Sequence, residues 1–185
     1  MNLIAAVSKN WGIGKENDLL FHIPADMKLF RQHTEGHVIV IGRKTLESFP
    51  GKKPLKNRIN IVLTRDLDYE CEGAILCYSK EEVLNEIARF PTEEVYICGG
   101  EQIYRMFLDD CDTAYITKVE QEREADRFLE NLDQSDRWKL SECSRMQEHE
   151  GVAFQFCTYQ KISCSGACHA CSGGCDMTSG KEMKR

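Results

Sequence analysis

Two short runs of purely apolar residues, at 3–7 and 38–41, constrain the fold of this chain more than any other feature of its sequence. The runs are continuous rather than alternating, so both faces of each strand are expected to be buried. Strand-like runs recur at 59–63, 74–77 and 95–98, with helical segments between them. Strands that alternate with helices in this way predict a mainly parallel sheet with helices on both faces.

Helix signals flank these runs. Pro24 suits the first turn of a helix that ends near Gly36. Ser79, followed three residues later by Glu82, is a capping box for a helix that stops before Pro91. Further short helices are expected over 43–49 and 101–108. The late segments 113–119, 137–146 and 152–160 are predicted as strands without helices between them, which makes the C-terminal edge of the sheet antiparallel.

Length and charge set further bounds. A chain of 185 residues accommodates one α/β domain, expected over 1–162, and an appended tail over 163–185. The net charge of −6 argues against a nucleic-acid partner, which usually meets a basic face. No apolar run approaches the roughly 18 residues that span a bilayer, and no signal-peptide pattern opens the chain. We therefore expect a cytoplasmic monomer with a small-molecule substrate and no membrane partner.

Residues 8–23 contain two glycines, Asn10, Asn17 and Trp11 without any clear period. This pattern predicts a long irregular loop, and loops of this length often act as lids over a site. The helix that follows brings Asp26, Met27 and Phe30 to one side, because residues three and four apart face together. A carboxylate among apolar side chains favours its neutral form unless a ligand meets it. The alternative is an acidic residue that only complements the helix dipole.

Two glycine segments follow strands and open helices, at 42–45 and 99–104. Helix N-termini at the carboxyl ends of parallel strands bind anions, and glycine lets the backbone approach a ligand closely. The backbone N–H groups of the two segments would bind a pyrophosphate placed between them. The chain has no G-x-G-x-x-G fingerprint, and taken alone a glycine after a strand is more often just a turn.

In order and spacing, the segments 3–7, 10–17, 19–30, 38–45 and 95–104 together closely resemble dihydrofolate reductase. The resemblance covers about residues 1–160. It implies NADPH-dependent reduction of 7,8-dihydrofolate to 5,6,7,8-tetrahydrofolate by hydride transfer, in support of one-carbon and thymidylate metabolism. It implies that Asp26 is the catalytic residue, that it binds the amino-pyrimidine edge of the pterin, and that it favours protonation of the ring nitrogen.

The same resemblance assigns further roles. Thr117 would hydrogen-bond the Asp26 carboxylate, Arg58 would bind the α-carboxylate of the substrate's glutamate tail, and a cis peptide would join Gly99 to Gly100. Substrate contacts are implied for Ile4, Ala5, Leu19, Phe21, Asp26, Met27, Phe30, Leu55, Arg58, Cys98 and Thr117. Cofactor contacts are implied for Ala6, Ile13, Gly14, Asn17, Gly42, Arg43, Lys44, Thr45, Leu63, Thr64, Arg65, Gly99, Gly100, Glu101, Gln102, Ile103 and Tyr104.

Arg43 and Arg65 are the implied partners of the adenosine 2′-phosphate, because guanidinium groups suit phosphate geometry. Their alternative is a pair of solvated surface arginines. The chain also departs from the family. Leu20 and Phe21 stand where many members carry proline and tryptophan, and Cys98 replaces a larger aliphatic residue of the pocket wall. None of these departures removes a group that the chemistry requires.

Ten cysteines fall into two sets. Six are scattered through the domain, at positions 71, 77, 98, 111, 143 and 157, and we expect them to be buried free thiols in a reducing compartment. The other four, Cys164, Cys168, Cys171 and Cys175, have the spacing C-x₃-C-x₂-C-x₃-C with His169 among them. This set resembles a compact metal-binding knuckle, with zinc favoured over an iron–sulfur cluster. The alternative is a disordered tail of small residues with reactive thiols.

Two other functions are open at this point. One is a related pteridine or pyrimidine reductase of the same fold, which the presence of both Asp26 and Arg58 disfavours. The other is a non-catalytic metal-carrying or redox-sensing protein, with the cysteine tail as its working part. That reading requires lost catalytic residues, and none is visibly lost.

Overall fold

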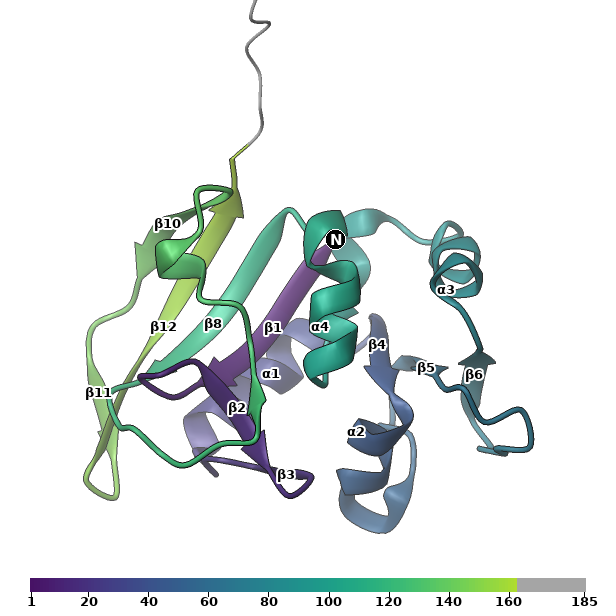
Figure 1. Cartoon of the computed structure of the whole chain (residues 1–185), viewed down its shortest axis with the longest axis horizontal. Coiled ribbons are helices and arrows are strands. Elements are labelled where there is room, and N and C mark those ends of the chain that lie inside the picture. Colours follow the sequence, from purple (N-terminus) through teal and green to yellow (C-terminus); the bar gives the residue numbers. More distant parts are fainter. Residues whose placement is uncertain (163–185) are drawn as a thin grey trace, which may run out of the picture.

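The computed structural model describes residues 1–162, and its central feature is a twisted sheet with helices on both faces (Figure 1). The strands run in the spatial order β10-β12-β8-β1-β7-β4-β5-β6, and β11 pairs with β12. They are β1 (Asn2–Val7), β4 (Val38–Gly42), β5 (Ile59–Leu63), β6 (Ala74–Cys77), β7 (Val95–Ile97), β8 (Thr113–Val119), β10 (Trp138–Cys143), β11 (Gln147–His149) and β12 (Val152–Lys161).

The pairing is parallel from β8 across to β6 and antiparallel where β12 joins β8 and β10 joins β12. The predicted mainly parallel sheet with an antiparallel C-terminal edge is therefore confirmed. The early strands are central because their apolar runs can be buried on both faces. The register places Ala6 of β1 opposite Thr117 of β8.

Alternate residues of the central strands face opposite layers. Leu3 and Val7 pack with α3 (Lys80–Ile87) and α4 (Glu101–Phe107) on one face. Ile4 and its neighbours pack with α1 (Pro24–Thr34) on the other, where α2 (Arg43–Ser48) also contributes Leu46. Figure 1 shows α4 in front of the sheet and α1 behind it. The chain thus forms one three-layered domain.

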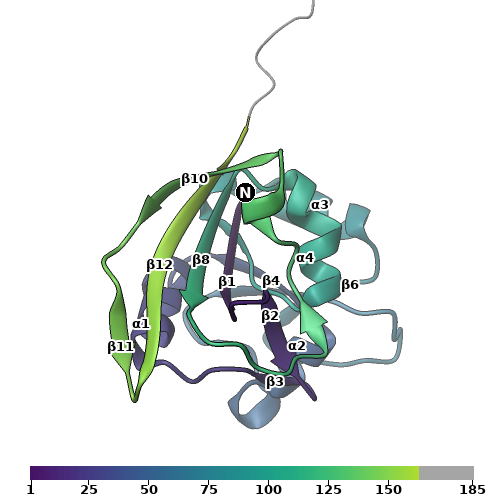
Figure 2. The ribbon, with the colours of Figure 1, turned by 60° about the vertical axis from the view of Figure 1, so that its left-hand side comes forward.

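The prediction of an irregular loop over 8–23 is wrong in part. β2 (Gly12–Lys15) and β3 (Asp18–Leu19) form a hairpin there, and β9 (Arg127–Phe128) completes a small sheet in the order β3-β2-β9 (Figure 2). The hairpin turn is Glu16-Asn17, and both residues have positive φ, of 52° and 65°. A two-residue turn with two positive φ values matches the twist of the flanking strands.

The other helix and strand predictions need smaller changes. α1 ends at Thr34, two residues before Gly36, whose φ is 85°. The capping box is confirmed, since Ser79 Oγ accepts a hydrogen bond from the backbone N–H of Glu82. The strand predicted over 137–146 is shorter, since β10 ends at Cys143 and contains a bulge between Leu140 and Glu142, and β11 is a separate strand that begins at Gln147. The remaining short helices are 3₁₀ turns, η1 (Pro50–Lys52), η2 (Thr92–Glu94), η3 (Leu108–Asp110) and η4 (Leu132–Gln134).

The prediction of six free thiols in the domain is also wrong for two of them. Cys143 of β10 and Cys157 of β12 lie directly opposite each other and form a disulfide. Antiparallel neighbours bring their Cβ atoms within bonding range of such a bridge, and this pairing depends on a register that spacing alone does not reveal. Cys71, Cys77, Cys98 and Cys111 are free, as predicted.

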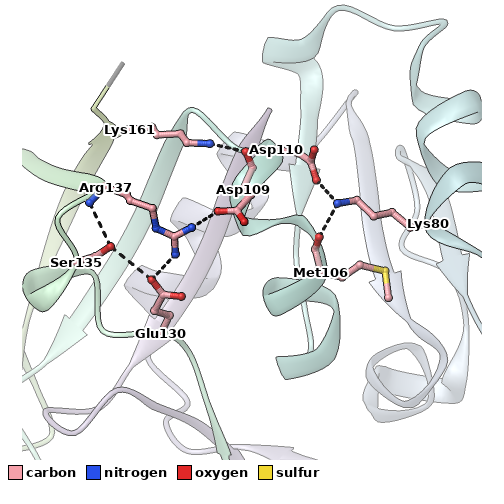
Figure 3. A network of polar contacts seen from close by, with 8 residues as sticks. All are labelled: Lys80, Met106, Asp109, Asp110, Glu130, Ser135, Arg137 and Lys161. Carbon is pink, nitrogen blue, oxygen red and sulfur yellow. Dashed lines mark hydrogen bonds and ion pairs between the residues drawn. The ribbon is translucent and has the colours of Figure 1, made fainter. Parts of the chain in front are cut away.

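Polar contacts fix the C-terminal end of β12 against η3 (Figure 3). Lys161 donates through Nζ to the carbonyl of Asp109, and Arg137 bridges Asp109 and Glu130. On the other side of η3, Lys80 pairs with Asp110 at 2.6 Å. The chain is therefore held firmly up to the last described residues. None of the helices over 1–162 is long and apolar enough to cross a membrane.

Candidate active site

The first turn of α1 carries Asp26 to the face of the sheet. Pro24 occupies the start of the helix, where its missing N–H costs nothing, and the N-cap residue Ile23 offers no side-chain cap. Asp26 lies opposite β8, and Thr117 Oγ1 donates a 2.6 Å hydrogen bond to its Oδ1. Thr117 itself is 2% exposed. The hydrogen bond implied by the family resemblance is therefore present.

Burial raises the pKa of the Asp26 carboxyl above its ordinary value, while the hydrogen bond from Thr117 acts in the opposite direction. The side chain is half-buried by area, so one carboxylate edge remains open to a ligand. No cationic side chain is among the groups that shift its pKa. A ligand that donates hydrogen bonds to this edge would therefore meet an unneutralised carboxylate.

Apolar side chains line the space beside Asp26. Ile4 of β1 is buried, and Phe30, Leu55 and Cys98 pack around the same cluster as half-buried groups. Burial raises the pKa of Cys98 strongly, which keeps it a neutral thiol. These residues come from four separate elements or loops, and the structure packs them into one cluster. Ala5 lies in the strand next to them and is half-buried.

Arg58 stands at the far end of α1 from Asp26. Its Nε donates to Thr34 Oγ1 at 2.8 Å, and its Nη1 donates to the carbonyl of Lys56 at 2.8 Å. The guanidinium carbon lies 5.9 Å from the centre of the Phe30 ring. Two of its nitrogens are thus fixed by the protein, and Nη2 remains to meet a carboxylate.

Two buried polar residues that sequence reasoning missed hold this end of the site. Thr34 is fully buried and donates to the carbonyl of Phe30 at 2.7 Å while it accepts from Arg58. Asn60 is 2% exposed, and its side chain both accepts from and donates to the backbone of Leu55 at 2.9 Å. The sequence does carry a signal for Asn60, because it is a single polar side chain within the otherwise apolar run 59–63.

The two glycine segments lie together at the carboxyl ends of β4 and β7. The backbone N–H of Gly42 donates to the carbonyl of Gly99 at 2.8 Å, and the Gly99–Gly100 peptide is cis, as the resemblance implied. A Cβ added to Gly99 would stand 3.0 Å from the Tyr104 ring, and one added to Gly100 would stand 3.3 Å from Thr45 Oγ1. This close backbone cradle joins the N-termini of α2 and α4 and fits a pyrophosphate.

The cations near this cradle are arranged unequally. Arg43 lies 3.5 Å from Asp66 and 3.6 Å from Glu47, and its guanidinium stacks over Tyr69 at 5.6 Å. Arg65 is exposed, and Thr64 is buried with its hydroxyl accepting from the N–H of Asp66. Arg65 is therefore the freer of the two arginines predicted to bind a phosphate.

The β2–β3 hairpin borders the cradle, since Asn17 Nδ2 donates to the carbonyl of Lys44 at 3.1 Å. The 120–126 loop braces the hairpin, where Lys15 pairs with Glu124 at 2.7 Å and the N–H of Glu16 donates to Asp126 at 3.1 Å. Arg123 stacks over Phe21 at 4.5 Å and donates to the carbonyl of Leu20. Sequence reasoning missed these bracing residues, because they act through positions far apart in the chain.

The other predicted site residues divide by burial. Gly14, Ile103 and Tyr104 are buried, and the Tyr104 hydroxyl donates to the carbonyl of Ile4 at 2.8 Å. Phe21 is buried in a separate cluster with Phe154 and Val119. Leu19 and Met27 are about half exposed, at 50% and 47%. Among the remaining predicted contacts, four side chains are half-buried, namely Ala6, Ile13, Leu63 and Glu101. Two are exposed, namely Lys44 and Gln102.

The predicted zinc ligands Cys164, Cys168, Cys171 and Cys175 lie outside the residues that the structure describes. Within 1–162, no group of three or more histidine, cysteine, aspartate or glutamate side chains is arranged to hold a metal ion. The candidate site therefore consists of an acid, an apolar wall, an arginine and a glycine cradle.

Known proteins are similar to this chain in both sequence and fold. The family model for dihydrofolate reductase matches residues 1–161. The dihydrofolate reductase of Bacillus subtilis (strain 168) is 39% identical over 169 residues, which cover 90% of this chain and 98% of that protein. That of Haemophilus influenzae is 37% identical over 139 residues, covering 75% and 83%.

A solved structure agrees with these relatives. The dihydrofolate reductase from Enterococcus faecalis, complexed with NADP(H) and RAB-propyl, superposes with a TM-score of 0.77 at 32% sequence identity. The match covers 86% of this chain and 95% of that one. Sequence and fold therefore agree, and this chain belongs to the dihydrofolate reductase family.

Proposed function

We propose that this protein reduces 7,8-dihydrofolate to 5,6,7,8-tetrahydrofolate with NADPH and so supports one-carbon and thymidylate metabolism. The observation that carries the proposal is the half-buried Asp26 carboxyl, which Thr117 orients at 2.6 Å beside an apolar wall. A flat heterocycle with an amino-pyrimidine edge satisfies both features. Its rings pack against apolar side chains while two N–H groups meet the carboxylate.

The residues of the chain divide the work. Asp26 binds the amino-pyrimidine edge and, by its negative charge, favours protonation of the pterin ring nitrogen through water. Thr117 holds the carboxylate in place. Arg58 binds the α-carboxylate at the other end of the substrate, and the hairpin at 12–19 closes over the reacting ring and excludes water.

The glycine cradle supports NADPH as the cofactor, which supplies the hydride when it is bound. Backbone N–H groups at the starts of α2 and α4 would hold the pyrophosphate. A side chain at position 42, 99 or 100 would crowd Ile103, Tyr104 or Thr45, respectively. Arg65, with Arg43, would select the 2′-phosphate of NADPH. Tyr104 and Thr45 border the same space.

The direct test is to follow NADPH absorbance with purified protein, with and without dihydrofolate. We expect oxidation that requires dihydrofolate and that Asp26→Asn nearly abolishes. Substrate-independent oxidation, or equal rates in both proteins, would contradict the proposal. A related pteridine or pyrimidine reductase is disfavoured, because the matching family model and the similar curated proteins are dihydrofolate reductases.

Finer features are also part of the proposal. We propose that the protein acts as a cytoplasmic monomer with no nucleic-acid partner. We also propose that Cys164, Cys168, Cys171 and Cys175 bind one zinc ion when they are reduced, because four closely spaced thiolates match its preferred ligand set.

A further inference from the structure

A groove lies between α1 and the outer strands of the large sheet, apart from the candidate active site. Its volume is about 290 Å³, and its lining comes from α1, β8, β12 and the end of β10. Leu29 and His33 of α1 form one wall, while Tyr115 of β8 and Phe156 of β12 contribute the sheet side. Figure 2 shows α1 behind β12. This cavity is the α1–β12 groove.

The α1–β12 groove and the candidate active site border neighbouring stripes of the same helix. Residues four apart share a helix face, so Leu29 and His33 form the stripe along the groove, and Asp26 and Phe30 form the next one. None of the residues that line the groove was assigned to substrate or cofactor. A ligand in the groove would therefore lie beside the active site without entering it.

Aromatic rings make up much of the lining. The rings of His33 and Tyr115 have centroids 4.2 Å apart, and Tyr115 also stacks with Tyr96 at 6.4 Å. His33, Tyr115 and Phe156 are half-buried, so part of each ring remains accessible. Burial and the neighbouring His37 lower the pKa of His33, so its ring is neutral above pH 7. A neutral aromatic lining favours a flat ring as the ligand.

Glu142 is the one charged side chain of the α1–β12 groove when His33 is neutral. It lies opposite Thr158 of β12, and opposite residues of an antiparallel pair face the same side of the sheet. The ion pairs of residues 1–162 leave Glu142 without a cationic partner. A carboxylate beside aromatic rings is complementary to a ligand that combines a ring with a positive charge.

We propose that the α1–β12 groove binds a small protonated aromatic amine, in which a single ring carries a primary ammonium group on a short chain. The ring packs against His33, Tyr115 and Phe156. The ammonium group donates hydrogen bonds to Glu142 and Thr158. The volume limits the ligand to this size, because pockets for drug-sized ligands begin at about 300 Å³. The site does not depend on the proposed reduction of dihydrofolate.

The test is an NMR titration of the full-length protein with phenethylamine at pH 7.5, followed through the ring signals of its histidines. The His33 signals are assigned by their loss in His33→Gln. We expect them to shift saturably, with a Kd of about 1 mM, an ordinary affinity for a fragment of this size. His22 and His149 lie outside the groove, so their signals should move little and serve as references.

Two analogues of the ligand separate the contributions of charge and ring. Phenethyl alcohol keeps the ring and lacks the charge, whereas cyclohexylethylamine keeps the charge and lacks the aromatic ring. Each should bind about threefold more weakly than phenethylamine, because exposed ion pairs and exposed cation–π contacts are both weak. Equal affinity for the alcohol and the amine would show that the groove does not recognise the charge, and would overturn the proposal.

Matched variants locate the charge that is recognised. Glu142→Gln keeps the shape of the side chain but removes its charge, so it should abolish the preference for the amine over the alcohol. Glu148→Gln is the control, because Glu148 is an exposed acid on β11 outside the groove, and the preference should be unchanged. Asp26→Asn tests the other acid beside apolar side chains, and it should leave the His33 shift unchanged.

Three further outcomes would contradict the proposal. Loss of binding in Asp26→Asn but not in Glu142→Gln would place the amine in the candidate active site. The absence of any saturable His33 shift would show that the groove does not bind such amines. Sedimentation that reveals a dimer, dissociated by phenethylamine, would show that a second copy of the chain fills the groove instead.

Discussion

The hydroxyl of Thr117 donates to the carboxylate of Asp26 at 2.6 Å, across 91 residues of sequence. The bond joins the first turn of α1 to the middle of β8 and orients the Asp26 carboxylate. It lowers the pKa of Asp26 while burial raises it. The ionisation of this acid is therefore set by two opposing local effects.

Removing the hydroxyl should leave burial unopposed. A hydrogen bond to a charged group contributes about 1.5–3 kcal/mol, so Thr117→Val should raise the pKa of Asp26 further. Thr117→Ser, which retains a donor, is the matched control. Carbon-13 titration of the aspartate side chains measures the shift. A pKa that is unchanged or lowered in the valine variant would show that the hydroxyl does not stabilise the charged form.

Ionisation of Asp26 should also lower the free energy of unfolding of the protein as the pH rises. Its pKa is higher in the folded protein than in the unfolded chain, so the folded state binds more protons between the two values. The resulting cost is absent below the unfolded pKa and complete above the folded one. Asp26→Asn should therefore melt above the parent at pH 7, with the difference vanishing toward pH 3. Calorimetry across this range tests it, and an equal or lower melting temperature at pH 7 would contradict it.

Arg58→Leu should raise the KM for dihydrofolate far more than the KM for NADPH. A desolvated carboxylate that loses its charged partner costs about 2–5 kcal/mol, or about 30-fold and more in affinity. Thr34→Val should give a smaller effect in the same direction, because Thr34 positions Arg58 through Nε. Equal changes in both KM values would indicate that these two residues are structural.

Arg65→Ala should weaken NADPH binding more than NADH binding, since only NADPH carries the 2′-phosphate. Arg43→Ala should have a smaller effect, because Asp66 and Glu47 already neutralise that guanidinium in part. Fluorescence titration with each cofactor measures the preference. Unchanged selectivity in both variants would remove the two arginines from the phosphate site.

Reduced full-length protein should bind about one zinc per chain, and acid or a chelator should release it, because thiolate ligands bind metal in competition with protons. Metal analysis of anaerobically purified protein tests this zinc binding. A full-length chain without stoichiometric metal would exclude the zinc site.

A chain that ends after Lys161 should still fold, since β12 is complete there and its end is held by Asp109 and Asp112.

Much of the architecture follows from local sequence, because a buried strand or a capped helix is encoded within a few neighbouring residues. The runs at 3–7 and 38–41 became β1 and β4, and Ser79 caps α3 as predicted. The hairpin at 12–19 was missed because Glu16 is an unusual residue at positive φ. Its turn carries no glycine to mark it.

The features of the site that sequence did not reveal depend on long-range register. Thr34 supports Arg58 across 24 residues, and the Cys143–Cys157 pair exists only because β10 and β12 align those two positions. The roles of Asp26, Thr117 and Arg58 were assigned through family resemblance. The helix signals alone are also explained by an acidic residue in the first turn that complements the helix dipole. The structure adds the physical contacts that connect them.

The most direct test of the proposed catalytic role is the rate of hydride transfer in Asp26→Asn. Pre-steady-state oxidation of NADPH by saturating dihydrofolate at pH 7 isolates the chemical step from product release. The amide keeps the shape of the carboxylate but lacks its charge, so we expect the rate to fall by about 10²–10⁴-fold, the usual contribution of a positioned acid or base. Hydride transfer at close to the parent rate in the asparagine variant would contradict the assignment of Asp26.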